Sequence, residues 1–157
     1  MGIFAGSEVV ELGIQIEKNG KDFYEALVKQ SKNEHAKTLF GYLAGEEEKH
    51  IMTFQKLLDS IEKYEPAEVY SQEYFEYMNL LAGEYVFTRK DKGVEIARNI
   101  KSDKEAVEIG IKFEKDSILF YEGMKKLVPD YDKKIIDELI FQEQQHLKKL
   151  SELRSKI

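Results

Sequence analysis

The chain has 157 residues, 42% of them hydrophobic, which suffices for a substantial core, and we predict a single domain over residues 1–157. Its formal net charge of −6 is spread along the chain without a Lys/Arg-rich block, so we expect neither nucleic acid nor a membrane as partner. No apolar run approaches the roughly 20 residues of a membrane span, and residues 1–6 lack signal-peptide features, so we expect a soluble, cytoplasmic protein.

The composition favours helix throughout, because the chain has only two prolines, abundant Glu, Lys and Leu, and few alternating β-branched runs. The first long helix is predicted to follow Ser7, a residue type that caps helix N-termini. Its core-facing side chains recur at steps of three and four: Val10, Gly13, Glu17, Gly20, Tyr24 and Leu27. Glu17 is therefore expected on the buried face.

A turn at residues 31–33 leads to a second predicted helix over residues 34–58, so the first pair (7–58) forms an antiparallel hairpin. A glutamate and a histidine interrupt its otherwise apolar inner face, which carries Leu39, Leu43, Glu47, His50, Phe54 and Leu57. His35 has no partner motif and is expected at the surface, and Glu46 and Glu48 are expected to face outward or sideways.

A long crossover over residues 59–101 is predicted to join the two halves of the chain. It contains Pro66 and a predicted short helix over residues 71–82 that ends at Gly83. Its many aromatic side chains are expected to cover one side of the bundle, with a dimer contact as the alternative: Tyr64, Tyr70, Tyr74, Phe75, Tyr77, Tyr85 and Phe87.

The second helix pair is predicted over residues 102–155 and begins with a capping box from Ser102 to Glu105. The inner face of its first helix carries Val107, Gly110, Glu114, Ser117, Tyr121 and Met124. After a turn at residues 128–130, the inner face of the last helix carries Ile136, Leu139, Glu143, His146, Leu150 and Leu153. Two hairpins joined by a crossover predict an all-α, antiparallel four-helix bundle.

The two helix pairs are copies of one duplicated segment. Residues 13–30 (GIQIEKNGKDFYEALVKQ) match residues 110–127 (GIKFEKDSILFYEGMKKL) at eight of 18 positions. Among the identities, Glu17 pairs with Glu114, and Tyr24 pairs with Tyr121. A repeat on this scale indicates that one supersecondary unit, here a helix pair, has been used twice.

Each copy ends in a Glu-x-x-His motif, Glu47 to His50 and Glu143 to His146. Residues three apart in a helix lie on one face, about 4.5 Å apart along the axis, so both side chains of a motif can reach the same depth of the core. A single motif of this kind is usually a surface contact within one helix. Two motifs in register, each on an apolar face and each preceded by a matching glutamate, predict a metal site.

Four carboxylates inside an apolar bundle would each cost several kcal/mol unless paired with positive charge. No lysine or arginine shares these faces at the same level, whereas two divalent cations would balance the four charges. Because the chain has no cysteine, the ligands must be carboxylates and imidazoles, which favour iron, with manganese and zinc as alternatives. The predicted ligands are Glu17, Glu47, His50, Glu114, Glu143 and His146.

The E-x6-Y and E-x-x-H pattern, used twice, resembles the rubrerythrin-related branch of the ferritin-like superfamily. The resemblance covers all four long helices and leaves the crossover unmatched. It implies a ferritin-like fold with a di-iron centre bridged by carboxylates such as Glu47 or Glu17, and a reaction with peroxide or dioxygen. It also implies tyrosines beside the ligands, here Tyr24 and Tyr121, which would bind ligand carboxylates or supply an electron.

The chain departs from rubrerythrins in two respects. It has no cysteine and hence no rubredoxin domain, so electrons are expected from a separate donor protein. Ser117 stands where rubrerythrins carry an additional glutamate, and Gly20 occupies the matching position of the first helix. These small residues either leave room for a small oxidant or accommodate packing, and the sequence leaves open whether peroxide reduction is retained.

Three classes of function fit these residues. The first is a di-iron oxidoreductase that reduces H2O2 or O2, acting as a homodimer with a separate electron donor. The second is a ferroxidase or iron-storage protein, which would form a large multi-subunit shell. The third is a helical interaction protein with a structural metal site.

Overall fold

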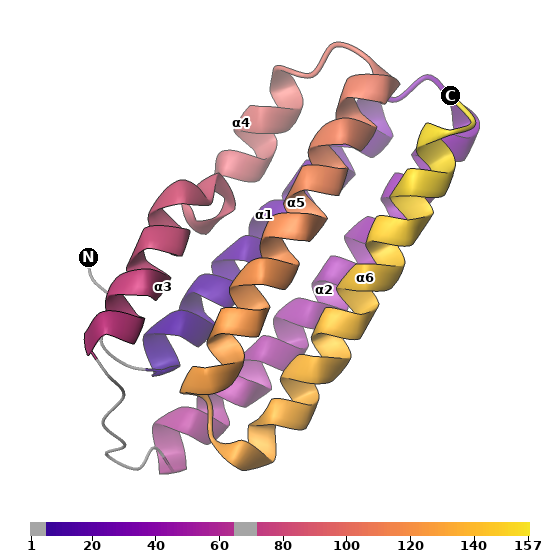
Figure 1. Ribbon diagram of the computed structural model, residues 1–157. Helices are drawn as coiled ribbons and strands as arrows, with labels where there is room; N and C mark the ends of the chain where they lie inside the picture. Colours follow the sequence, from indigo (N-terminus) through magenta and orange to yellow (C-terminus); the bar gives the residue numbers. More distant parts are fainter. Residues whose placement is uncertain (1–5, 65–71) are drawn as a thin grey trace.

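The computed structural model describes residues 6–64 and 72–157, and within these ranges it contains helices and turns but no strand. Its four long helices are α1 (Gly6–Gln30), α2 (Glu34–Tyr64), α5 (Asp103–Met124) and α6 (Lys133–Arg154). The hairpins α1–α2 and α5–α6 lie side by side (Figure 1), which confirms the predicted all-α four-helix bundle. None of the described helices combines the length and the apolar character needed to cross a membrane.

The inner faces of the four long helices are those that the periodicity predicts. Every side chain of the predicted inner rows of α1, α5 and α6 is buried, and in α2 only Leu39 is partly exposed. The first turn of α5 is capped as expected, since Ser102 Oγ accepts a hydrogen bond from Glu105 N at 3.1 Å. The 3.6-residue period therefore fixes which side chains enter the core.

Three boundaries of the long helices differ from the prediction. Helix α1 begins at Gly6, so Ser7 lies inside the helix, and its prediction as the N-cap was wrong. Helix α2 continues to Tyr64 instead of ending at residue 58, because Ile61 extends the buried row of Leu57 by one more turn. Helix α6 begins only at Lys133, after a 3₁₀ turn over Asp130–Asp132.

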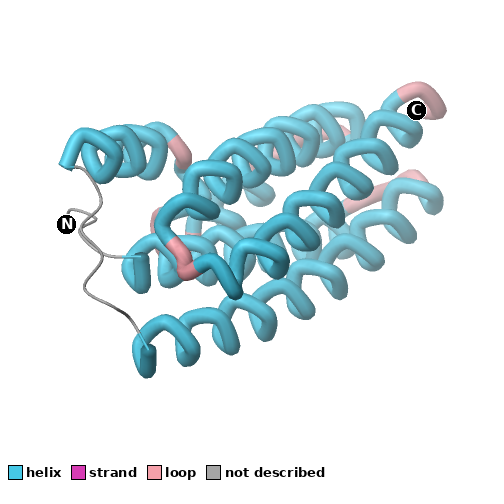
Figure 2. The backbone as a smooth tube through the Cα atoms, turned by 60° about the horizontal axis from the view of Figure 1, so that its bottom comes forward, coloured by secondary structure: helices cyan, strands magenta, loops and turns pink. Residues whose placement is uncertain are grey.

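Residues 72–101 of the crossover pack along the α1 and α5 side of the bundle (Figures 1 and 2). It contains α3 (Gln72–Glu84), a 3₁₀ turn (Val86–Thr88) and α4 (Lys92–Arg98). The prediction located α3, but its end at Gly83 was wrong, because the helix continues through Gly83 to Glu84. The prediction missed α4, which is too short to show a periodic pattern. Tyr85 and Phe87 are buried against the bundle, as predicted, whereas Tyr77 is exposed. Pro66, Tyr70 and the side chain of Tyr64 lie outside the described residues.

A buried asparagine in α1 holds the crossover in place. Asn19 Nδ2 donates hydrogen bonds to the backbone oxygens of Phe87 and Arg89, both at 2.6 Å. Its Oδ1 accepts one from Gly93 N at 3.1 Å. A Cβ atom on Gly93 would lie 2.0 Å from Asn19 O, so only glycine permits this approach of α4 to α1. The crossover is thus fixed to α1 two residues from Glu17.

Asn19→Ala is expected to lower the free energy of unfolding by about 2–4 kcal/mol, because it leaves two carbonyls and one N–H of the crossover without their partner. Urea unfolding followed by circular dichroism measures this change. The matched control is Asn99→Ala, since Asn99 is exposed and its side-chain Nδ2 donates to Glu95 O of α4, the helix that it caps. Equal effects of the two substitutions would contradict the proposed clamp.

Candidate metal centre

All six predicted ligands meet inside the bundle, and each long helix contributes at least one. Glu17 comes from α1 and Glu114 from α5, while α2 and α6 each supply a glutamate and a histidine three residues apart. None of the six is more than 2% exposed: Glu17, Glu47, His50, Glu114, Glu143 and His146. The duplication therefore places two equivalent sets of side chains face to face.

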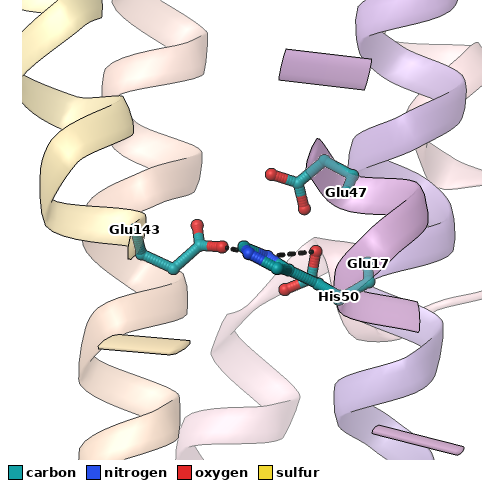
Figure 3. A group of neighbouring side chains, drawn as sticks. All are labelled: Glu17, Glu47, His50 and Glu143. Atoms are coloured by element: carbon teal, nitrogen blue, oxygen red, sulfur yellow. Dashed lines mark ion pairs between the residues drawn. The ribbon is translucent and has the colours of Figure 1, made fainter. Parts of the chain in front are cut away.

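These side chains form two overlapping groups, in each of which the possible ligand atoms lie within 4.8 Å of one another. The first group is Glu17, Glu47, His50 and Glu143, drawn in Figure 3. The second group contains Glu47, Glu114, Glu143 and His146. Because Glu47 and Glu143 belong to both groups, the arrangement favours these two as the shared carboxylates, with Glu17 and Glu114 serving one group each.

The histidines turn their Nδ1 atoms toward the carboxylates. His50 Nδ1 lies 2.7 Å from Glu143 Oε1 and 3.4 Å from Glu17 Oε2 (Figure 3). His146 Nδ1 lies 3.6 Å from both Glu47 Oε1 and Glu114 Oε1. The two imidazole rings stack, with centroids 5.5 Å apart and planes 17° apart.

The hydrogen bonding of the cluster is incomplete in a way that fits bound cations. Within residues 6–64 and 72–157, each of the six residues has a buried nitrogen or oxygen atom without a hydrogen-bond partner, and for Glu47 and Glu143 this holds for both carboxylate oxygens. Among the described residues, no lysine or arginine forms an ion pair with any of the four carboxylates. Buried polar atoms in this number normally have partners, so the donor set suits two divalent cations.

The pKa values of the clustered side chains also indicate a site that suits cations. Burial raises the pKa of Glu47 well above its usual range, and the charges of Glu143 and Glu17 raise it further. Burial and the charges of Glu114 and Glu17 likewise raise the pKa of Glu143. Burial would lower the pKa of His50, but the carboxylates of Glu17 and Glu143 outweigh it and raise the pKa to about 12. Protons therefore occupy this site when no cation does.

Two tyrosines connect the repeats crosswise. Tyr24 of α1 donates a hydrogen bond to Glu114 Oε1 at 2.8 Å, and Tyr121 of α5 donates one to Glu17 Oε1 at 2.5 Å. Burial, together with the neighbouring carboxylates, raises the pKa of both phenols well above 10. Each tyrosine thus stays protonated and holds one oxygen of a carboxylate from the other half of the bundle.

The two small residues beside the ligands are enclosed by aromatic rings. A Cβ atom on Gly20 would lie 2.5 Å from the ring of Phe113 and 3.1 Å from Glu47 Oε2. Ser117 Oγ is hydrogen-bonded to Tyr85 Oη at 2.8 Å. Of the two alternatives for these positions, the structure favours packing over open space for an oxidant.

Three neighbours of the centre escaped the sequence analysis or were placed only loosely by it. Gln142 Oε1 lies 2.6 Å from His50 Nε2, and the repeat register contained the signal, since Gln142 precedes Glu143 as Glu46 precedes Glu47. Glu46 faces sideways toward His146, with Oε1 4.0 Å from Nε2. Tyr85 comes from the crossover, where no repeat or motif marks it. His35 and Glu48 are exposed, as predicted.

Comparisons with known proteins agree with this geometry. The family model described as Rubrerythrin matches residues 8–154. The chain belongs to the rubrerythrin family. A solved structure titled as a "putative ferritin-like diiron-carboxylate protein" from Thermotoga maritima is similar to this rubrerythrin-family chain, with 27% identity and a TM-score of 0.68. The similarity covers 99% of this chain and 97% of the other. Among curated proteins, the search found no match.

The shifted pKa values predict how pH affects the metal-free protein. His50, with its pKa raised from 6.5 to about 12, contributes stability that is fully present below pH 6.5 and lost as the pH rises toward 12. The raised pKa values of Glu47 and Glu143 likewise lower the stability of the folded protein as the pH rises above 4.5. The lowered pKa of Glu17 has the opposite effect, since its contribution to stability is present above pH 4.5 and is lost as the pH falls below 4.5.

The free energy of unfolding of the metal-free protein should therefore fall between pH 6.5 and about pH 9, by up to about 1.4 kcal/mol per pH unit for each proton lost on unfolding. Urea unfolding in the presence of a chelator measures this slope. A stability that is constant or rises over this range would contradict the electrostatic account.

Proposed function

We propose that this rubrerythrin-family protein is a di-iron carboxylate oxidoreductase that reduces H2O2 or O2 with electrons from a separate donor protein. The observation that supports this most is the convergence of four buried carboxylates and two imidazoles whose facing atoms lack hydrogen-bond partners. Oxygen and nitrogen donors of this kind suit iron, manganese or zinc better than calcium.

The ligand roles follow from the two groups. Glu17 and His50 would bind the cation at one metal position, and Glu114 and His146 would bind the cation at the other. Glu47 and Glu143 would bind at both positions. When bound, a pair of ferrous ions would supply the two electrons that, together with two protons, reduce one H2O2 to two water molecules.

The protein's own residues would keep the ligands in place. Tyr24 and Tyr121 each occupy one oxygen of Glu114 and Glu17 and leave the other oxygen, Oε2, without a partner. Each of these carboxylates is thereby oriented to offer one oxygen to a cation. Phe113 and the Tyr85–Ser117 pair close the sides of the cluster and keep bulk water away from it.

The electron donor is proposed to be a separate protein because the chain has no cysteine and so no rubredoxin-type iron site. The homodimer and the cytoplasmic location stay predictions. The same ligand set would also suit a ferroxidase, so the size of the assembly is part of the test.

Protein loaded anaerobically with two ferrous ions per chain is expected to consume one H2O2 per two irons oxidised, and to elute as a small oligomer on size exclusion. Optical spectra and a peroxide assay follow the reaction. Failure of H2O2 and O2 to oxidise the bound iron would contradict the proposed redox function. Elution as a large shell that takes up many irons per chain would favour iron storage instead.

Removal of one shared carboxylate tests the ligand assignment. Glu47→Gln and Glu143→Gln are expected to abolish binding of the metal pair while keeping the helical content. The metal-free variants should be at least as stable as the parent, with a gain of about 1 kcal/mol expected at neutral pH, because the substitution removes a carboxyl group that burial and neighbouring charges force to stay protonated at a free-energy cost. Elemental analysis and circular dichroism measure both effects.

The matched control is Glu48→Gln, because Glu48 is exposed and pairs with Lys21 at 3.2 Å, away from the cluster. It should bind two metals per chain. Full metal content in Glu47→Gln and Glu143→Gln would rule out the assigned ligands.

A further inference from the structure

The residues that precede the two shared glutamates make different contacts with the two histidines. Gln142 and Glu46 occupy equivalent positions of the repeat, one residue before Glu143 and Glu47. From α6, Gln142 contacts His50 of α2 at a distance of 2.6 Å between Oε1 and Nε2. The equivalent contact between Glu46 Oε1 and His146 Nε2 is 4.0 Å long. Only the first is a hydrogen bond.

The orientation of the Gln142 amide is fixed by a third side chain. Gln142 Nε2 donates a hydrogen bond to Glu138 Oε1 at 3.1 Å, one turn earlier in α6. A carboxylate accepts here, so the amide nitrogen faces Glu138 and the amide oxygen faces His50. Since an amide oxygen only accepts, His50 must carry a proton on Nε2. With a cation bound and His50 neutral, the lone pair of Nδ1 would therefore face the point beside Glu17 and Glu143 where the first group of ligand atoms converges.

His146 has no corresponding support. Neither its Nε2 nor its Nδ1 atom has a hydrogen-bond partner in the part of the chain that the structure describes. Glu46 is engaged elsewhere, since it accepts a hydrogen bond from Tyr42 Oη at 2.9 Å and pairs with Lys49 Nζ at 3.1 Å. Among the described residues, the ring of His146 packs edge to face against Tyr42, with centroids 6.4 Å apart, and stacks on His50, while its nitrogen atoms come no closer than 3.6 Å to a carboxylate oxygen.

We propose that Gln142 is a positioning residue that makes the metal position at His50 the tighter of the two, so that the first divalent cation binds with Glu17, Glu47, His50 and Glu143. This inference rests on the proposed two-metal centre. Removing the hydrogen-bond partner of a metal-binding histidine commonly weakens metal binding about 10–100-fold. A difference of this size between the two positions is enough to produce stepwise loading.

The test is a titration of the metal-free protein with Co²⁺ under anaerobic conditions, followed by calorimetry and by visible absorption. The parent should bind two cobalt ions per chain in two resolved steps. Gln142→Leu should weaken the tighter step about 10–100-fold and bring the two steps together. Gln142→Glu, which keeps an acceptor oxygen, should restore the separation and the absorption spectrum of the one-cobalt form.

Glu46→Gln is the matched control at the equivalent repeat position and should leave the tighter step within about threefold, because Glu46 makes no hydrogen bond to a ligand. Thermal unfolding of the metal-free variants reports any purely structural effect. Unchanged tight binding in Gln142→Leu, or two equal steps in the parent, would overturn the role of Gln142. Absence of cobalt binding by the parent would instead overturn the metal centre itself.

Discussion

The burial of four carboxylates at one level of a helical bundle is the constraint on which the rest of this structure depends. Glu17, Glu47, Glu114 and Glu143 are fully buried, and no lysine or arginine among the described residues pairs with them. Without cations, the repulsion is relieved only by protonation of Glu47, Glu143 and His50. Metal binding must therefore displace protons, which couples metal affinity, pH and stability.

The duplication explains how one type of helix pair supplies both halves of the buried carboxylate cluster. Each copy brings a glutamate, a tyrosine and a Glu-x-x-His motif, and each tyrosine donates to the glutamate of the other copy. Neither copy completes the cluster alone. Outside the ligands the symmetry ends, because Gln142 binds His50 whereas Glu46 turns to Tyr42 and Lys49. The crossover adds a further asymmetry through Tyr85, which covers the α5 side only.

The sequence was sufficient to predict the inner faces of the long helices and the convergence of the six proposed ligand side chains. Both depend on the helical period of 3.6 residues and on a repeat whose register is clear from aligning the two copies of the sequence. Contacts without such a pattern were not predictable. Asn19 binds backbone atoms 68–74 residues away, and no repeat marks it. The repeat register marks Gln142 as the counterpart of Glu46, but it does not show that the Gln142 side chain reaches His50 across 92 residues. The seven-residue α4 and the first turn of α1 depend on packing that periodicity does not report.

The central claim is that this cluster binds two cations that share Glu47 and Glu143. A crystal structure of the iron-loaded protein, with anomalous scattering recorded on both sides of the iron absorption edge, tests it most directly. We expect two iron peaks inside the bundle, one beside His50 and one beside His146, with both shared carboxylates between them. A bundle interior without iron peaks, or with iron only at the surface, would contradict the account.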